Sequence, residues 1–393
     1  MYYGSVFEIK KEIPDNVGDQ LLAEKKRGEN VVDTKHNPSR RSAAPVFVLG
    51  SARSGTTLLY DMLLSAGGFA VYLAESNAFN VLAPHFGDLG RRKARQELLR
   101  VWLSTNLFRA CDLDASDIEN EFLEQGRNIG DFLQIVMGKI TRAQGMQRWA
   151  ENSPESILHL PLIKRLIPDA LVIHIIRDGR DVAVSLSNVR CLRPFPWQDR
   201  ISLTGAGIYW EWIVEYGRRY GRRLGPDYME VHFEDLVAAP RETLKTIGSF
   251  IDHELDYDRI REVGYGSVSK PNTSFRSEPR ENFNPVGRWK KGFSPEQLLR
   301  FESMLGKTLT ELGYITATDG TDRGMNMEMR ATRLMYRTYF EGKLRLKGNP
   351  LVQRLRPLTA AHIDATVLGE DHPPELPPQA KTVVSPQSPR SSR

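Results

Sequence analysis

The sequence predicts an α/β fold in which helices cover both faces of a central parallel β-sheet. Three apolar runs have the length of strands, residues 45–49, 170–177 and 228–233. The first two are almost uninterrupted by polar side chains, which is typical of strands buried on both faces, as in parallel sheets. Helical stretches alternate with these runs, and this alternation is typical of a parallel sheet with helices on both sides. The helical stretches are residues 91–107, 117–143, 156–167, 203–224 and 240–252.

The composition is that of an ordinary soluble globular protein, with 40% hydrophobic and 26% charged residues among 393. The net charge of +5 suits anionic ligands without requiring nucleic acid, and we expect no nucleic-acid partner. Two cysteines are too few for a disulfide framework or a cysteine-rich metal site, and they favour a reducing compartment.

The first residues, "MYYGSVFEIKKEIPD", carry charges where a signal peptide needs an apolar core. No run in the sequence approaches the roughly 18 apolar residues that a membrane span needs. We therefore expect a cytoplasmic protein.

Changes in composition divide the chain into a polar N-terminal arm, a main domain, a basic helical extension and a tail. These parts are residues 1–44, 45–320, 321–356 and 357–393. The tail is rich in Pro and Ser and is expected to be disordered.

The basic extension carries an unusual charge balance. Residues 330–356 hold eight Lys or Arg side chains against one acid, Glu341. Two interpretations stay open for it. The segment is either a solvated helix or a surface for weak contact with an anionic membrane or a polyanionic acceptor.

The first strand leads into the turn "GSARSGTT", which opens a helix, and this layout is typical of a phosphate-binding loop. Gly50 and Gly55 have the spacing of a Walker A motif, but Thr56 stands at the lysine position. Backbone N–H groups of the first helical turn are unpaired and, with the helix dipole, favour an anion in front of the helix. The alternative is an ordinary strand–turn–helix.

The side chains of this loop also suit an anion. Gly55 allows the backbone to approach it closely, and Ser54, Thr56 and Thr57 offer hydroxyl donors. Arg53 offers a planar, permanently charged fork that matches oxyanions.

A second segment, "IIRDGRDVAVSL", places Arg177 at the end of a buried strand and Ser185 about two turns into the next helix. Ligands of open α/β sheets bind beyond the carboxyl ends of the strands. We therefore expect Arg177 at the same rim as the first loop. The alternative is a surface arginine paired with Asp178 or Asp181.

A third segment, "GRWKKGFSPE", holds Gly287, Arg288, Trp289 and Lys290 before a helix capped by Ser294. An aromatic face beside cations suits a nucleotide, through base stacking and phosphate pairing. The alternative is a helix-entry turn with a core tryptophan.

Taken together, these segments resemble the sulfotransferase family that uses 3′-phosphoadenosine 5′-phosphosulfate (PAPS). The resemblance runs from about Pro45 to Tyr314 and includes "VHFEDLVAAPRETLKTI" as a later strand–acid–helix block. The R-S-G-T-T form of the first loop is closer to the tyrosylprotein and carbohydrate enzymes than to the cytosolic ones, which carry lysine there.

The resemblance implies a P-loop-like sulfotransferase fold, PAPS as co-substrate and no metal. The three segments would bind the 5′-phosphosulfate, the 3′-phosphate and the nucleotide. The implied reaction is in-line transfer of the sulfuryl group to an acceptor hydroxyl, with Arg53 stabilising the leaving oxygen. Glu75 occupies the position of a glutamate base in the tyrosylprotein-type enzymes, and His85 and His159 are the weaker alternatives for the base.

One position departs from the family. The segment "RWAENSPESILHL" often carries a lysine where this chain has Asn152, and an amide can only hydrogen-bond. Glu151 and Ser153 are weaker candidates for contacts with the acceptor. Trp210 and Trp212 would either line the acceptor pocket or pack in the core.

Two other functions stay open. A P-loop kinase or nucleotidase would bind ATP or GTP with magnesium, against which the absent lysine at Thr56 argues. A catalytically inactive nucleotide-binding relic would fit Asn152. The sequence does not choose the acceptor among a peptide, a sugar, a lipid and a small molecule.

Overall fold

The fold was analysed in a computed structural model, which describes residues 41–189, 195, 198–263, 284–317, 324–349, 352 and 357–368. The helices before the third strand are α3 (Thr56–Ala66), η2 (Ala78–Leu82), α4 (Ala83–Phe86), α5 (Arg92–Trp102), α6 (Asn106–Arg109), α7 (Ala115–Gln125), α8 (Ile129–Ala143), η3 (Pro154–His159) and α9 (Leu160–Leu166). The later helices are α10 (Gly179–Ser187), α11 (Leu203–Gly221), η4 (Arg222–Asp227), α12 (Phe233–Ala238), α13 (Pro240–Ile251), α14 (Tyr257–Val263), α15 (Trp289–Gly292), α16 (Pro295–Glu311), α18 (Met327–Lys347) and α20 (Ala360–Leu368).

The centre of the fold is a parallel sheet with the strand order β2-β1-β3-β4. The strands are β1 (Val46–Gly50), β2 (Ala150–Glu151), β3 (Leu171–Ile176) and β4 (Tyr228–His232), and every pairing is parallel. The predicted fold class and the three predicted strands are confirmed. The edge strand β2 was not predicted, because a run of two residues carries no periodic signal.

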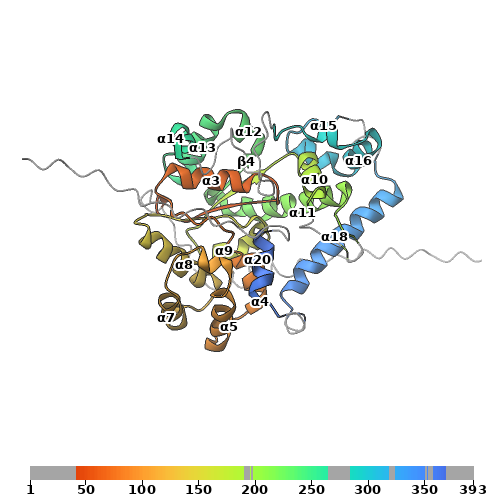
Figure 1. The fold of residues 1–393 in the computed structure, drawn as a ribbon. Helices are drawn as coiled ribbons and strands as arrows, with labels where there is room; N and C mark the ends of the chain where they lie inside the picture. The colour runs from red at the N-terminus through yellow and green to blue at the C-terminus, as the bar shows by residue number, and fades with distance from the viewer. Residues whose placement is uncertain are drawn as a thin grey trace, which may run out of the picture. The chain divides into compact units, whose positions relative to one another are not determined.

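Both faces of the sheet are covered, as the apolar runs predicted. Val46 and Val48 of β1 pack on one side with α3, α12, α13 and α14. Phe47 and Leu49 point to the other side, into the larger core that includes α8, α9 and α11. Figure 1 shows α13 and α14 above the sheet and α8 and α9 below it. Alternate residues of β1 therefore pack into the cores on opposite faces of the sheet, which explains why the whole strand is apolar.

Two of the predicted long helices are each divided in two. The stretch 117–143 forms α7 and α8, because Asn128 and Asp131 make a capping box that starts a new helix. The stretch 91–107 forms α5 and α6, and Thr105 caps the second by accepting from the Phe108 N–H.

The basic extension is a packed helix rather than a fully solvated one. Tyr336 and Phe340 of α18 are buried, and Phe340 stacks on Trp212 of α11 with 5.6 Å between ring centroids. The Arg333 guanidinium lies 2.7 Å from the buried Glu211 carboxylate. Arg354 and Arg356 lie outside the described residues.

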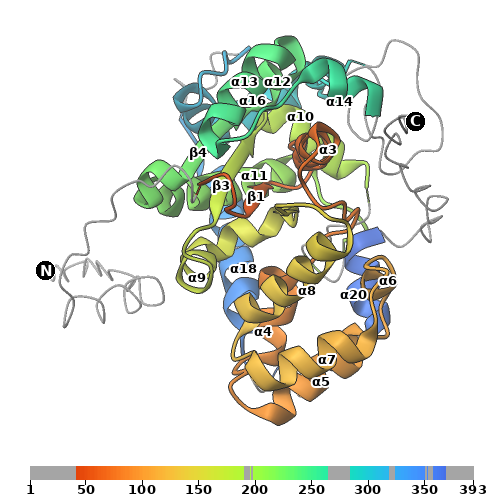
Figure 2. The same ribbon diagram turned by 90° about the vertical axis from the view of Figure 1, so that its left-hand side faces the viewer.

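The start of the expected tail also differs from the expectation of disorder. Residues 360–368 form α20, in which Ile363 is fully buried. The Asp364 carboxylate accepts from the Asn106 N–H at 2.9 Å, and the Leu358 N–H donates to His85 Nε2 at 3.1 Å. Figure 2 shows α20 beside α6. Residues 369–393 lie outside the described residues.

Of the N-terminal arm, the structure describes residues 41–44. Arg41 fixes this end by donating to the Phe250 carbonyl at 2.6 Å and to the Pro226 carbonyl at 2.7 Å. In the described part of the chain, none of the helices combines the length and the apolar character required to cross a membrane.

Candidate functional site

The turn between β1 and α3 has the backbone of an anion-binding loop. Gly55 has φ 95°, and a Cβ added there would lie 2.3 Å from the Phe233 ring, so only glycine fits. The first turn of α3 has neither a side-chain cap nor an acidic residue. Ser54 is fully buried, and its hydroxyl has no hydrogen-bond partner in the described part of the chain. Unpaired donors therefore surround the front of α3.

Arg53 joins this loop to α10. Its Nε donates to the Ser185 hydroxyl oxygen at 3.0 Å, and its carbonyl accepts from Arg177 Nη1 at 2.9 Å. Arg53 itself has φ 69°, an uncommon conformation for a residue with a side chain. The structure thus brings together three of the residues that the sequence singled out, from segments far apart in the chain.

Arg177 is a buried cation with spare donor capacity. Its guanidinium lies over the Phe233 ring at 4.6 Å, and its Nε has no hydrogen-bond partner among the described residues. Burial lowers the pKa of Arg177, and the charge of Arg288 lowers it further against the opposing effect of nearby carboxylates. A buried polar atom in a native protein normally has a partner. An anion in front of Arg177 would supply one.

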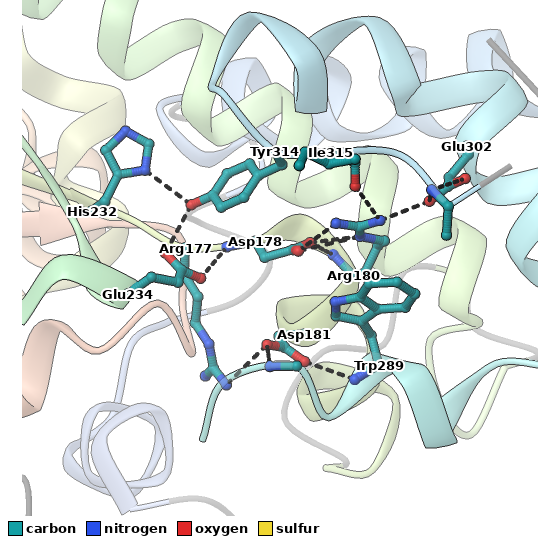
Figure 3. A network of polar contacts seen from close by, with 12 residues as sticks. Arg177, Asp178, Arg180, Asp181, His232, Glu234, Trp289, Glu302, Tyr314 and Ile315 are labelled. Carbon is teal, nitrogen blue, oxygen red and sulfur yellow. Dashed lines mark hydrogen bonds and ion pairs between the residues drawn. The ribbon is translucent and has the colours of Figure 1, made fainter. Parts of the chain in front are cut away.

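The segment around residue 287 docks on α10 through Asp181. The Asp181 carboxylate accepts from the Gly287 N–H at 2.7 Å and from the Trp289 N–H at 2.8 Å (Figure 3). Arg177 Nη2 also donates to the Pro285 carbonyl. Gly287 has φ 75°, which this turn requires. Asp181, which the sequence suggested as a partner for Arg177, lies 4.0 Å from it and chiefly holds the loop.

Trp289 is held by a residue that the sequence reasoning missed. The Arg180 guanidinium covers one face of the indole, 3.9 Å from the ring centroid. Arg180 is fixed by ion pairs of 2.7 Å to Asp178 and to Glu302, as Figure 3 shows. Its only signal in the sequence is its place in "RDGRD". Arg288 and Lys290, on either side of Trp289, are exposed.

A polar network links the ends of β3 and β4. The Asp178 N–H donates to one oxygen of Glu234 at 2.9 Å, and the Tyr314 hydroxyl donates to the other at 3.0 Å. His232 Nδ1 lies 3.2 Å from the same hydroxyl (Figure 3). Burial raises the pKa of Glu234. This network fixes the start of α10, and with it Arg177, at the carboxyl edge of the sheet.

Glu75 lies close enough to the carboxyl groups of Glu151 and Glu155 for their charges to act on it. Burial raises the pKa of Glu75 to about 8, and the charges of Glu151 and Glu155 contribute. Its side chain is half-buried and makes no hydrogen bond or ion pair within the described ranges. A carboxylate with this pKa is a stronger base than an ordinary one.

The last residue of β2 and the segment after it hold the turn that carries Glu75. Glu151 accepts from the Ser76 hydroxyl at 2.6 Å and from both the N–H and the hydroxyl of Ser153. The Ser153 hydroxyl accepts from the Asn77 N–H at 3.0 Å. Glu151 and Ser153 are thus occupied by internal contacts, which leaves them little capacity for contacts with an acceptor.

Asn152 is the exception in this segment. It is 5% exposed, and its Oδ1 has no partner in the described part of the chain. Because β2 runs parallel to β1, Asn152 leaves the sheet at the same edge as the phosphate loop. Its buried oxygen can accept one further hydrogen bond.

The remaining candidates have structural contacts. His85 accepts from the Leu358 N–H, and burial lowers the pKa of His159 to about 4. Trp210 is fully buried and donates to the Arg177 carbonyl at 3.0 Å. Trp212 donates to the Glu341 carboxylate at 2.6 Å. The two tryptophans pack in the core, one of the two interpretations that the sequence left open.

In the ranges that the structure describes, no group of three or more His, Cys, Asp or Glu side chains is arranged to hold a metal.

Comparison with known proteins gives a family match and several similar chains. A sequence model of the sulfotransferase family matches residues 45–257. Sulfotransferase 1B1 of Mus musculus is 24% identical over 189 residues, 41% of this chain and 62% of that protein. The chain thus spans less than two thirds of the curated relative.

Among solved structures, the sulfotransferase domain from the curacin biosynthetic pathway has a TM-score of 0.49 and 14% identity, covering 69% of this chain and 98% of that one. Mouse sulfotransferase SULT7A1 complexed with PAP has a TM-score of 0.40 and 13% identity, covering 69% and 87%.

Proposed function

This chain belongs to the sulfotransferase family, and on that premise we propose that it transfers a sulfuryl group from PAPS to an acceptor hydroxyl. One observation carries the proposal: Arg53, Arg177 and Ser185 meet in front of an uncapped helix, where Arg177 Nε and Ser54 Oγ are buried without partners in the described part of the chain. This donor set fits two separate phosphate groups.

The nucleotide would bind along the rim from α3 to α15. The N–H groups at the start of α3, with Ser54 and Thr57, would hold the 5′-phosphosulfate. Ser185 accepts from Arg53, so its own O–H remains for a 3′-phosphate beside Arg177. Trp289, with one face covered by Arg180, would offer its other face to the base.

When bound, PAPS would supply an activated sulfuryl group, whose sulfur an acceptor hydroxyl would attack in line, with adenosine 3′,5′-bisphosphate as the leaving group. Arg53 and the loop N–H groups would stabilise the charge that develops on the leaving oxygen, because they are fixed before reaction. Glu75 would take the proton of the acceptor hydroxyl, since it is half-buried and a strong base for a carboxylate. Asn152 would donate or accept a hydrogen bond where related enzymes often have a cation.

The proposal does not include a metal. Two alternative functions differ from this one in the ligand they need or in the lack of transfer. A kinase or nucleotidase would require magnesium with ATP or GTP, and an inactive relic would bind nucleotide without transfer.

The R-S-G-T-T loop favours an acceptor of the tyrosylprotein or carbohydrate kind, and a cytoplasmic location fits the two cysteines.

Thermal unfolding with ligands tests this function. Adenosine 3′,5′-bisphosphate without metal should raise the melting temperature, and ³⁵S-labelled PAPS should then label a member of an acceptor panel of peptides, sugars, lipids and phenols. Stabilisation by magnesium–ATP alone would point to the kinase. Stabilisation by the bisphosphate with no labelled product would point to the relic.

A weak contact of residues 330–356 with an anionic membrane is a further part of the proposal. Its support is the outer face of α18, where Leu334, Met335 and Leu346 are exposed near Lys343 and Arg345. Arg333 and Arg337 are turned inward to Glu211 and Glu215 and would not contribute. Sedimentation with phosphatidylserine vesicles should weaken in Leu334→Ser/Leu346→Ser. Equal binding of this variant and the wild-type protein to the vesicles would exclude a membrane contact through these side chains.

A further inference from the structure

Helix α18 reaches the proposed acceptor side of the site through its last residue, Lys347. Lys347 Nζ lies 3.8 Å from the Glu155 carboxylate and donates to the Asn80 carbonyl at 3.4 Å. Asn80 belongs to η2, which follows Glu75, and Glu155 belongs to η3, which follows Asn152. One lysine side chain therefore connects the segment that follows Glu75 with the segment that follows Asn152. This lysine comes from outside the part of the chain that matches the family.

The same lysine helps to keep Glu155 ionised. Burial alone would raise the pKa of Glu155, but the charge of Lys347 outweighs it, together with the Tyr209 hydrogen bond and the charges of Lys343 and His159. The pKa of Glu155 is consequently lowered, so this carboxylate is an anion at neutral pH. Glu155 in turn is one of the two charges that raise the pKa of Glu75.

We infer that Lys347 is a positioning residue for the proposed transfer, which holds Glu155 as a fixed anion beside Glu75 and makes α18 part of the acceptor side. The inference rests on the proposed function. The charges that act on Glu75 are those of Glu151 of β2 and Glu155 of η3. The groups that face Glu155 are His159 of η3, Tyr209 of α11, and Lys343 and Lys347 of α18.

The electrostatic consequence has a definite sign. Removing a positive charge from a group of carboxyls raises their combined affinity for protons, so the last proton leaves at higher pH. Loss of the Lys347 charge should therefore raise the pH at which Glu75 ionises by roughly half a unit to one unit. Loss of the Glu155 charge should lower it, because a repelling anion is removed.

Lys347→Gln separates the charge from the packing, because its amide can still donate to the Asn80 carbonyl. Lys347→Arg keeps the charge, and Lys307→Gln removes an exposed lysine of α16 as a matched control. The ionisation of Glu75 is read without any acceptor, from the difference in unfolding free energy between each protein and its Glu75→Gln partner from pH 5 to 9. The pH profile of kcat/KM is measured in parallel where transfer is found.

The pH at which this free-energy difference is half changed, its midpoint, should rise in Lys347→Gln and fall in Glu155→Gln. It should not change in Lys347→Arg or Lys307→Gln. An unchanged midpoint in both Lys347→Gln and Glu155→Gln overturns the inference. If Lys347→Gln does not fold, the downward shift in Glu155→Gln decides. Failure of the proposed function has a different signature, since wild-type protein would then be neither stabilised by adenosine 3′,5′-bisphosphate nor active.

Discussion

The Nε–H of Arg53 donates to the hydroxyl oxygen of Ser185 at 3.0 Å, across 132 positions of the chain. This bond joins the loop after β1 to the helix after β3, the two neighbouring strands at the centre of the sheet. It also orients the serine hydroxyl as a donor. The proposed sites for the two phosphate groups of the nucleotide are therefore mechanically one unit.

Replacing Arg53 tests the stabilisation of the leaving oxygen. Arg53→Gln should lower the rate of transfer by roughly 10²–10³-fold, the usual effect of losing one preorganised donor. The rate is measured in single-turnover experiments with labelled PAPS, and exposed Arg91 provides the control variant Arg91→Gln. A wild-type rate in Arg53→Gln would exclude this role.

Replacing Ser185 tests the 3′-phosphate site. A hydrogen bond to a charged group contributes about 1.5–3 kcal/mol, so Ser185→Ala should bind adenosine 3′,5′-bisphosphate at least about tenfold more weakly. Adenosine 5′-phosphate lacks the 3′-phosphate and should bind both proteins equally in calorimetry. Ser187→Ala, which removes a hydroxyl bonded within the same helix, is the control. Equal losses for the two nucleotides would contradict the assignment.

Glu75 should control the pH dependence of transfer. Because a base must be deprotonated and the pKa of Glu75 is raised to about 8, the rate should rise with pH and level off above about 8. Glu75→Gln should bind nucleotide normally and transfer roughly 10²–10⁴-fold more slowly. Initial rates across pH 5.5–9.5 measure both effects. Full activity in this variant would remove Glu75 as the base.

Ionisation of Glu75 should lower the stability of the fold as the pH rises, whereas it should raise the rate of transfer. A folded-state pKa above the usual carboxyl value of about 4.3 contributes stability that is complete below that pH and is lost as the pH rises through about 8. Glu75→Gln should therefore become progressively more stable than the wild-type protein between pH 5 and 8. Chemical denaturation at each pH measures the difference, and a constant difference would show that Glu75 titrates normally.

Gly55 tests the close approach of the loop to β4. An alanine with positive φ costs about 1–2 kcal/mol, and overpacking against Phe233 adds about 1–3 kcal/mol. Gly145→Ala has the strain without the contact, because nothing lies within 4 Å of its added Cβ. Denaturant unfolding should show a larger loss of stability in Gly55→Ala than in this control. Equal losses would mean that Phe233 moves aside.

The sequence predicted the sheet well because a buried parallel strand must be apolar on both sides. Strand β1 shows why: Phe47 and Val48 belong to opposite cores, and both had to be apolar. The turn after β1 was recognisable by its glycine and hydroxyl residues in a short span, and its role in binding phosphate stays a prediction. The structure places Arg53, Arg177 and Ser185 together, while their roles remain predictions.

The residues that position the site were much harder to predict. Arg180 acts through Trp289 and Glu302, which are more than a hundred positions away, and no local pattern indicates such a contact. Helix α20 was not predicted, because the tail in which it lies is rich in Pro and Ser. Its Ile363 is nevertheless fully buried in the core. Long-range packing decided these features, and packing partners cannot be identified from a single sequence.

The contacts of α20 and of the residues just before it join the proposed acceptor side of the site to the end of the chain. Asp364 accepts from Asn106 of α6 and Leu358 donates to His85, and both partners lie between Glu75 and β2 in the sequence. If Glu75 is the base, as proposed, shortening or cleaving the chain before residue 357 should disturb the acceptor side by removing these contacts. The end of the chain would then be a means of regulating acceptor recognition.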